Sequence, residues 1–192
     1  MTGVIKQYWQ EVPASVKIFA KRALLLIAGW LLLYQLLLKP AGVPDRWLTH
    51  VTATSTVYVL NSWYGHGFAA TDGTMLNPVS GSTDKISFIT YKNILRLRIA
   101  DGCNALDLFM LYAGFLLCLP TGAARMTLFG ITGVIAIFVL NILRLYALVL
   151  LAINLPGWLN FAHHYAFTII VYCCIFAGWV FYAKSYTPGK MA

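Results

Sequence analysis

Charged residues are scarce in this sequence. They make up 10% of its 192 residues, and only six are acidic, whereas a soluble domain carries about 25% charged residues. Hydrophobic residues account for 60%. This composition excludes an ordinary soluble domain and indicates an integral membrane protein. The length leaves little chain for a second domain, so we expect one integral unit over residues 1–192.

The sequence also lacks a separate basic segment that could hold nucleic acid, although its formal net charge is +8. Basic residues instead flank the expected membrane spans, at Lys6, Lys17, Lys21, Arg22, Arg125, Lys184 and Lys190. Positive charge beside spans marks the cytoplasmic side. We therefore expect a multi-pass protein of the inner (cytoplasmic) membrane with both termini in the cytoplasm, in contact with the lipid bilayer and not with nucleic acid.

Paired cysteines are absent too. The four cysteines form no CxxC pair and show no metal-ligand spacing, so we expect no metal and no cofactor. Cys118, Cys173 and Cys174 lie within apolar runs, where cysteine usually behaves as a small hydrophobic residue. Cys103 alone stands at a predicted membrane boundary beside polar residues.

Four hydrophobic runs predict membrane helices, since about 20 residues are needed to cross a bilayer. The first covers 18–38, and we interpret it as a retained anchor because no small-x-small cleavage site follows it closely. The other three runs cover 104–119, 126–151 and 163–182. The predicted fold is an all-α membrane protein, a polytopic bundle of four to five transmembrane helices.

The stretch 39–102 is expected to lie outside, with an interfacial helix at 45–63. Asp45 is its predicted N-cap, and its predicted apolar stripe consists of Leu48, Val51, Ser55, Val59 and Trp63. Thr and Ser interrupt the apolar run, so we expect the helix to lie on or partly in the outer interface. If it crossed the membrane instead, everything after it would invert.

The rest of this external stretch predicts a loop and a small β-hairpin. Residues 65–84 are dense in Gly, Ser, Thr and Asp, which is typical of a loop. Residues 86–91 and 94–99 predict two short strands around Lys92-Asn93. A hairpin here leads the chain directly to Cys103.

The predicted topology brings polar residues from three helices to one membrane level, within a three-span core at 103–183. Cys103 begins the second span and His163-His164 begin the fourth, all at the outer end. Arg144 lies in the third span, some seven residues, or roughly 10 Å, below its outer end. Only one of the two histidines can face the others, because neighbouring side chains point about 100° apart on a helix.

Arg144 has two interpretations, because a charged residue within a span normally faces a partner or a water-filled cavity. A structural ion pair with Asp107 would suit a non-enzymatic membrane transport or assembly subunit. Alternatively, its charge could activate the Cys103 thiol or stabilise an oxyanion.

Two further interpretations of the same residues carry less weight. A thiol oxidoreductase is disfavoured because Cys103 has no resolving cysteine. A zinc site is an alternative without standard ligand spacing, and its candidate ligands are Cys103, His163, His164 and Asp107.

Three short motifs resemble those of the exosortase/archaeosortase family. They are IADGCNALDL at 99–108, NILRL at 141–145 and HHYAF at 163–167. Their order, spacing and membrane placement agree with the family, and the resemblance covers roughly residues 45–183. Ala105 stands where the family's cysteine motif has glycine after Cys-Asn.

The resemblance implies a membrane-embedded cysteine protease or transpeptidase that cleaves C-terminal sorting signals of secreted proteins at the outer face. Cys103 would be the nucleophile, His163 the general acid/base with His164 as the alternative, and Arg144 the electrostatic stabiliser. Supporting residues would be Asn104, Asp107 and Asn141. The partner would be a substrate tail composed of a motif, a transmembrane helix and a basic cluster. The sequence indicates neither the acceptor nor the oligomeric state.

Overall fold

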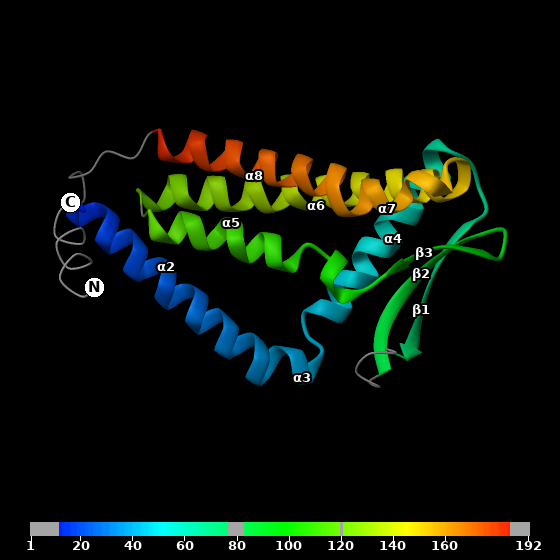
Figure 1. Ribbon diagram of the computed structural model, residues 1–192, viewed down its shortest axis with the longest axis horizontal. Helices are drawn as coiled ribbons and strands as arrows, with labels where there is room; N and C mark the ends of the chain where they lie inside the picture. Colours follow the sequence, from blue (N-terminus) through cyan, green and yellow to red (C-terminus); the bar gives the residue numbers. More distant parts are fainter. Residues whose placement is uncertain (1–11, 77–82, 120, 185–192) are drawn as a thin grey trace, which may run out of the picture.

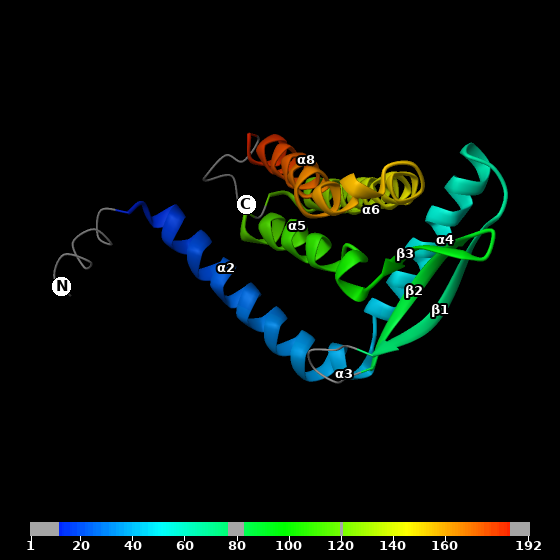
Figure 2. The same cartoon turned by 45° about the vertical axis from the view of Figure 1, so that its right-hand side comes forward.

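The computed structural model describes residues 12–76, 83–119 and 121–184, and most of them are helical. Helices α5 (Leu106–Cys118), α6 (Ala123–Asn154) and α8 (Phe167–Ala183) lie side by side along the long axis (Figure 1). Helix α2 (Ala14–Leu33) diverges from them. Helix α4 and a small sheet lie at the opposite end from the start of α2, as the turned view also shows (Figure 2).

In the described part of the chain, three helical segments are long and apolar enough to cross a membrane, which indicates a membrane protein. The first, Ala14–Ala41, joins α2, the π-helix η1 (Tyr34–Leu38) and α3 (Lys39–Ala41). The second is α6, and the third runs over Pro156–Ala183. The predicted four to five spans are not confirmed. Helix α5 has 13 residues, about 20 Å, which is short of the roughly 30 Å hydrocarbon core.

The third segment is not one uniform α-helix. It begins with the 3-10 turn η3 (Pro156–Trp158) and the short helix α7 (Leu159–Phe161), and continues through the π-helix η4 (Ala162–Ala166) into α8. Single π-helical turns within α-helices occur often at functional sites. Both adjacent histidines lie in this π-helical turn.

Helix α4 (Asp45–Trp63) forms where predicted, but its buried face differs from the predicted stripe. Its buried residues are Asp45, Leu48, Thr49, Thr52, Ala53, Thr56 and Leu60, whereas Trp63 is 70% exposed. Threonine can be buried because its hydroxyl bonds to its own helix, as Thr56 Oγ1 does to the Thr52 carbonyl at 2.8 Å. The N-cap prediction was also wrong: Pro44 occupies that position, and Asp45 lies in the first turn.

The sheet has three antiparallel strands in the order β1-β2-β3, so the predicted loop at 65–84 was wrong over β1 (Phe68–Leu76). The predicted hairpin of β2 (Thr83–Tyr91) and β3 (Ile94–Ile99) is confirmed. Its turn residues Lys92 and Asn93 have φ of 50° and 63°, as a type I′ turn requires. Residues 77–82 of the predicted loop lie outside the described residues.

Two hydrophobic clusters hold the molecule together. One joins α4, the sheet and the C-terminal half of α6, and it includes Ile89, Ile99, Leu145 and Leu148. The other joins α5, α6 and α8, and it includes Tyr112, Ile137 and Ile175. Cys103 packs against the first cluster and Ala105 belongs to the second, so the candidate nucleophile lies where the two clusters meet.

Candidate active site

Cys103 lies at the junction between the sheet and the helix bundle. It ends the 3-10 turn η2 (Asp101–Cys103), which follows β3 directly, and its backbone N–H donates to the Ala100 carbonyl at 2.8 Å. Its side chain is half-buried. The predicted hairpin does deliver the chain to Cys103, because only Ala100 separates the end of β3 from this turn.

Asn104, the residue after Cys103, is anchored to the beginning of α4. Its side-chain amide donates to the Asp45 carboxylate at 2.9 Å, the Asp45 carbonyl at 3.2 Å and Thr49 Oγ1 at 3.3 Å. Its side-chain oxygen accepts the Leu106 N–H at 2.9 Å, which gives a partner to one of the backbone N–H groups at the start of α5. Asn104 and Asp45 are both buried, so these bonds hold α4 and α5 together beside Cys103.

Ala105 adopts a left-handed backbone with φ of 67°, a conformation that favours glycine. It is also buried. This residue makes the bend between η2 and α5, so the helix begins at Leu106 rather than at Cys103. The position where the family motif has glycine is therefore one where the backbone conformation suits glycine.

Asn141 holds the main chain of Cys103 from the other side. Its side-chain amide on α6 donates to the Cys103 carbonyl at 2.9 Å, and the residue is only 1% exposed. Its side-chain oxygen is buried without a hydrogen-bond partner among the described residues. Cys103 is thus fixed between α4 and α6 by two buried asparagines.

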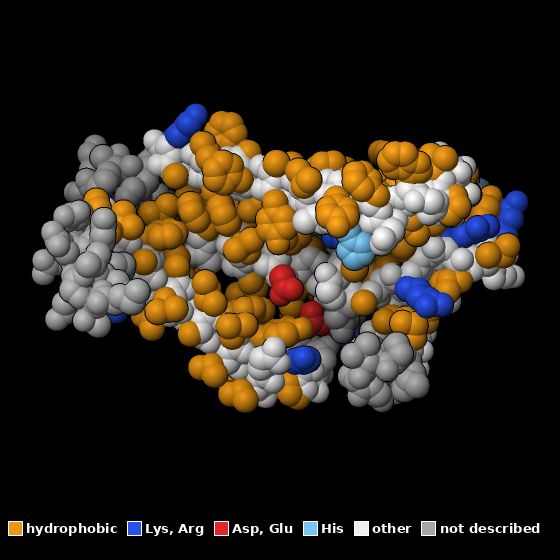
Figure 3. Space-filling model, viewed as in Figure 1, with side chains coloured by type: hydrophobic (Ala, Val, Ile, Leu, Met, Phe, Trp, Pro, Cys, Tyr) orange, Lys and Arg blue, Asp and Glu red, His pale blue; other side chains and the backbone are white. Residues whose placement is uncertain are grey.

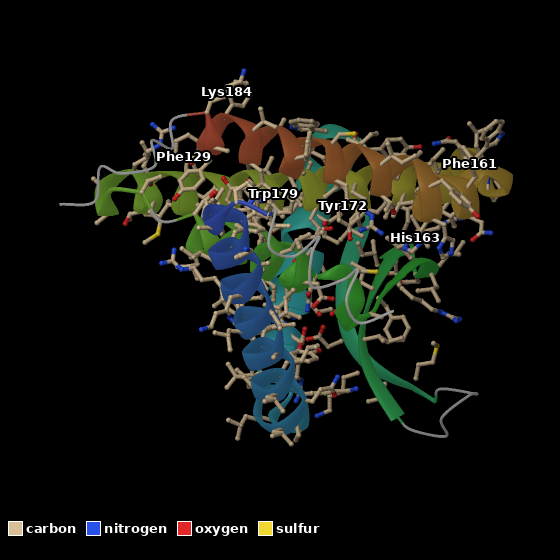
Figure 4. All side chains as sticks on the ribbon, turned by 60° about the vertical axis from the view of Figure 1, so that its left-hand side comes forward. Phe129, Phe161, His163, Tyr172, Trp179 and Lys184 are labelled. Carbon is tan, nitrogen blue, oxygen red and sulfur yellow. The ribbon has the colours of Figure 1, made fainter. Side chains whose placement is uncertain are left out.

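His163 is the histidine that approaches the thiol. The Cys103 Sγ and His163 Nε2 atoms are 3.9 Å apart, although 60 residues separate them in sequence. His163 is half-buried, and Figure 4 places it between the C-terminal helix and the sheet. His164 is exposed, and the two imidazole rings lie edge to face at 4.8 Å. The structure therefore brings His163, rather than His164, to Cys103.

Arg144 follows Asn141 by three residues on α6, so it lies about one turn nearer the C-terminal end of that helix. Helix α6 continues ten residues past Arg144, and this part packs against α4 and the sheet. Arg144 is close enough to His163 for an electrostatic interaction, and its Nε is buried without a hydrogen-bond partner among the described residues.

Asp107 does not pair with Arg144. In the part of the chain that the structure describes, the one ion pair joins His50 to Asp72. Asp107 is exposed and lines an apolar cavity between α2 and α5. The direction of the Asp107 side chain could not be predicted from its spacing to Cys103. The left-handed backbone at Ala105 interrupts the helix, so α5 begins only at Leu106. The Arg144–Asp107 ion pair, one of the two interpretations of Arg144, is therefore not formed.

Metal binding finds no support among residues 12–76, 83–119 and 121–184, where no group of three His, Cys, Asp or Glu side chains could hold a metal ion. The sequence did not indicate Asp45 and Thr49 as partners of Asn104. The sequence indicated Asp45 only as a helix cap. Its hydrogen bond with Asn104 joins residues 59 apart in the sequence, and spacing alone does not predict such a bond.

The arrangement is that of a thiol beside an imidazole, held at the junction of a membrane helix bundle and a small sheet. No family model, no curated protein and no solved structure matches this chain.

Proposed function

We propose that this protein is a membrane-embedded cysteine protease or transpeptidase of the exosortase/archaeosortase type. The observation that carries the proposal is the 3.9 Å approach of Cys103 Sγ to His163 Nε2 from two distant parts of the chain. A cysteine nucleophile needs a nearby base and partial solvent access. The half-buried thiol beside His163 meets both needs.

The proposed reaction begins with transfer of the Cys103 proton to His163. The thiolate attacks the carbonyl carbon of the scissile peptide and forms a tetrahedral oxyanion. His163 then gives its proton to the leaving amine as the C–N bond breaks, which leaves a thioester on Cys103. Water or an amine acceptor attacks the thioester, and the thiol is restored. Distances in a substrate-free site are often longer than in the reacting complex.

Arg144 is the proposed stabiliser of the oxyanion. Its Nε–H is buried and lacks a hydrogen-bond partner among the described residues, so it is available to donate. A fixed donor in a site with little water contributes most when charge develops in the transition state. Asn141 lies one turn away on the same helix and holds Cys103, which supports a positioning role for it.

The proposed orientation places Cys103 at the outer face of the inner membrane. The basic residues Lys17, Lys21 and Arg22 of α2, Arg125 of α6 and Lys184 after α8 lie near one end of the bundle (Figure 1). Clustered basic residues favour the cytoplasmic side. Lys6 and Lys190, which belong to the same prediction, lie outside the described residues. The sheet, α4 and Cys103 would then face outward.

The proposed partner is the transmembrane helix of a secreted protein's C-terminal tail. A cavity of about 560 Å³ opens between α2 and α5, and Phe19, Leu26, Trp30 and Leu111 are among its apolar lining residues. Figure 3 shows this hollow among hydrophobic side chains, with an acidic side chain at its edge. Helix α2 has no buried residue, so this face is open to the bilayer. Asp107, four residues after Cys103 in the sequence, is among its lining residues.

The test reconstitutes the purified protein with a secreted protein that carries a C-terminal motif, a transmembrane helix and a basic cluster. We expect the wild type to shorten this substrate and Cys103→Ala to leave it intact. Cys173→Ala, which removes an exposed cysteine on α8, is the matched control and should process normally. Equal processing by Cys103→Ala and wild type would rule out the mechanism.

The non-enzymatic alternative, a transport or assembly subunit, depended on a buried Arg144–Asp107 pair. That pair is not formed, so no observation now favours this alternative.

A further inference from the structure

A second cavity, of about 140 Å³, lies between the first turns of α4 and the strands β1 and β2. Neither Cys103 nor His163 lines it, although Thr49, which accepts a hydrogen bond from Asn104, does. Most of its exposed lining surface is apolar, but its lining residues include two cations (Arg46 and Lys85) and hydroxyl side chains such as Thr74 and Ser87. Taking about 30 Å³ per water molecule, the volume suits roughly four or five waters or one small hydrated ion.

Neither cation has a counter-ion within salt-bridge distance in the described part of the chain, where the one ion pair is His50–Asp72. Arg46 and Lys85 are both exposed, so their side chains are free to turn toward a ligand. Two cations on one small cavity favour an anion, and Asp72 offsets one of the two positive charges.

The acidic residue of the cavity is already engaged. Asp72 Oδ1 accepts the Ser87 hydroxyl at 2.6 Å, and Asp72 Oδ2 is 2.7 Å from His50 Nδ1. The Asp72 charge also attracts Arg46 at longer range, which keeps the guanidinium near the cavity. The formal charges of Arg46, Lys85 and Asp72 add up to +1, so the cavity still attracts an oxyanion.

The cavity lies where the first membrane segment ends. That segment ends at Ala41, and Arg46 follows five residues later. Val43 and Trp47 are 58% and 66% exposed beside it. Exposed tryptophan is typical of the membrane–water interface, the level at which lipid phosphates lie.

We propose that this cavity binds a phosphate group, in which Arg46 and Lys85 contact the phosphate oxygens. A guanidinium can donate two parallel hydrogen bonds to such a group, and an ammonium supplies a point charge. The phosphate is that of a lipid headgroup or of a soluble phosphate compound. The inference does not depend on the proposed protease activity.

The experiment measures binding by isothermal titration calorimetry to the full-length protein in neutral detergent. The two probes are inorganic phosphate and a short-chain phosphatidic acid, with diacylglycerol of the same chain length as the uncharged lipid control. We expect Arg46→Gln and Lys85→Gln each to weaken binding by about tenfold, the loss of roughly one charge-assisted hydrogen bond. Lys92→Gln removes the same charge at the exposed β2–β3 turn and is the matched control, with affinity nearly unchanged.

The two probes separate the sources of the phosphate. Binding of phosphatidic acid alone assigns the site to a lipid headgroup, and binding of both probes assigns it to phosphate from either source. Absence of binding to both probes would overturn the proposal. So would equal losses in Arg46→Gln and Lys92→Gln, because they would show attraction to overall charge rather than to this cavity. Circular dichroism of each variant confirms that these exposed substitutions leave the fold intact.

Discussion

The Asn141 side-chain amide on α6 donates a 2.9 Å hydrogen bond to the backbone carbonyl of Cys103. The candidate nucleophile is therefore held through its main chain, so its side chain remains free to react. Buried hydrogen bonds of this kind fix position strongly, because breaking them leaves an unsatisfied polar group.

Asn141→Ala should lower the rate of substrate processing while leaving the protein folded. The substitution removes the hydrogen bond from α6 to the Cys103 carbonyl, and the loss of this bond costs about 1–3 kcal/mol of stability. The measurements are the single-turnover rate and the thermal midpoint in detergent. Asn154→Ala is the matched control, since Asn154 lies on the same helix, is exposed and bonds only to its own helix at Leu150. Equal rates for the two variants would contradict the positioning role.

His163→Ala and His164→Ala should behave differently, although the residues are adjacent. His163 faces the thiol at 3.9 Å, whereas His164 is exposed. Loss of a general acid/base typically slows a reaction by about 10²–10⁴-fold, so we expect that loss for His163→Ala and near-normal processing for His164→Ala. A second readout is alkylation of Cys103 near neutral pH, which should slow only in His163→Ala. The reverse pattern would reassign the base to His164.

Ala105 offers a test of the backbone rather than of a side chain. Its φ of 67° costs an alanine about 1–2 kcal/mol, which glycine avoids. Glycine also loses more backbone freedom on folding and leaves the buried methyl group unfilled, at about 0.8 kcal/mol for the latter. We therefore expect Ala105→Gly to lie within about 1 kcal/mol of wild type and to remain active.

Ala105→Val provides the contrast, because a β-branched residue is a genuine outlier in the left-handed region. It should unfold at clearly lower temperature and lose processing, both measured beside Ala105→Gly in the same detergent. A stable, active Ala105→Val would show that the left-handed turn is not needed.

Parts of this structure follow from local sequence, and these could be predicted. The apolar runs predict the helices by composition, and the alternation of apolar and basic residues over 94–99 predicts a strand of the hairpin. The proximity of Cys103 and His163 could be predicted from topology, since the two residues precede helices α5 and α8 at the same end of the bundle.

Other parts depend on contacts between distant residues, and these could not be predicted. Strand β1 contains Gly73, which resembles loop sequence, but a Cβ there would come within 2.6 Å of the Phe88 ring on β2. The glycine thus permits close pairing rather than a turn. The buried threonines of α4 and the direction of Asp107 depend likewise on neighbours that sequence spacing does not reveal.

The stability of the region around β1 and α4 should depend on acid through Asp72. The Ser87 hydroxyl, and secondarily His50 and Arg46, hold the pKa of Asp72 below its ordinary value of 3.8, although burial opposes them. A carboxyl whose pKa is lowered by folding stabilises the protein above pH 3.8, and this contribution is lost as the pH falls through the lowered pKa. The side chain is 54% exposed, so the effect should be modest.

The measurement is the thermal midpoint of the purified protein as the pH falls from neutral to below 3.8. Asp72→Asn should flatten the acid limb of this curve, because no proton is then taken up at this position. Ser87→Ala should move the limb to higher pH, since it removes the largest cause of the lowered pKa. Ser62→Ala on the exposed face of α4 is the control and should match wild type, because its hydroxyl bonds only to the Tyr58 carbonyl of its own helix. Superimposable curves for wild type, Asp72→Asn and Ser87→Ala would show that the Asp72 cluster contributes nothing to acid stability.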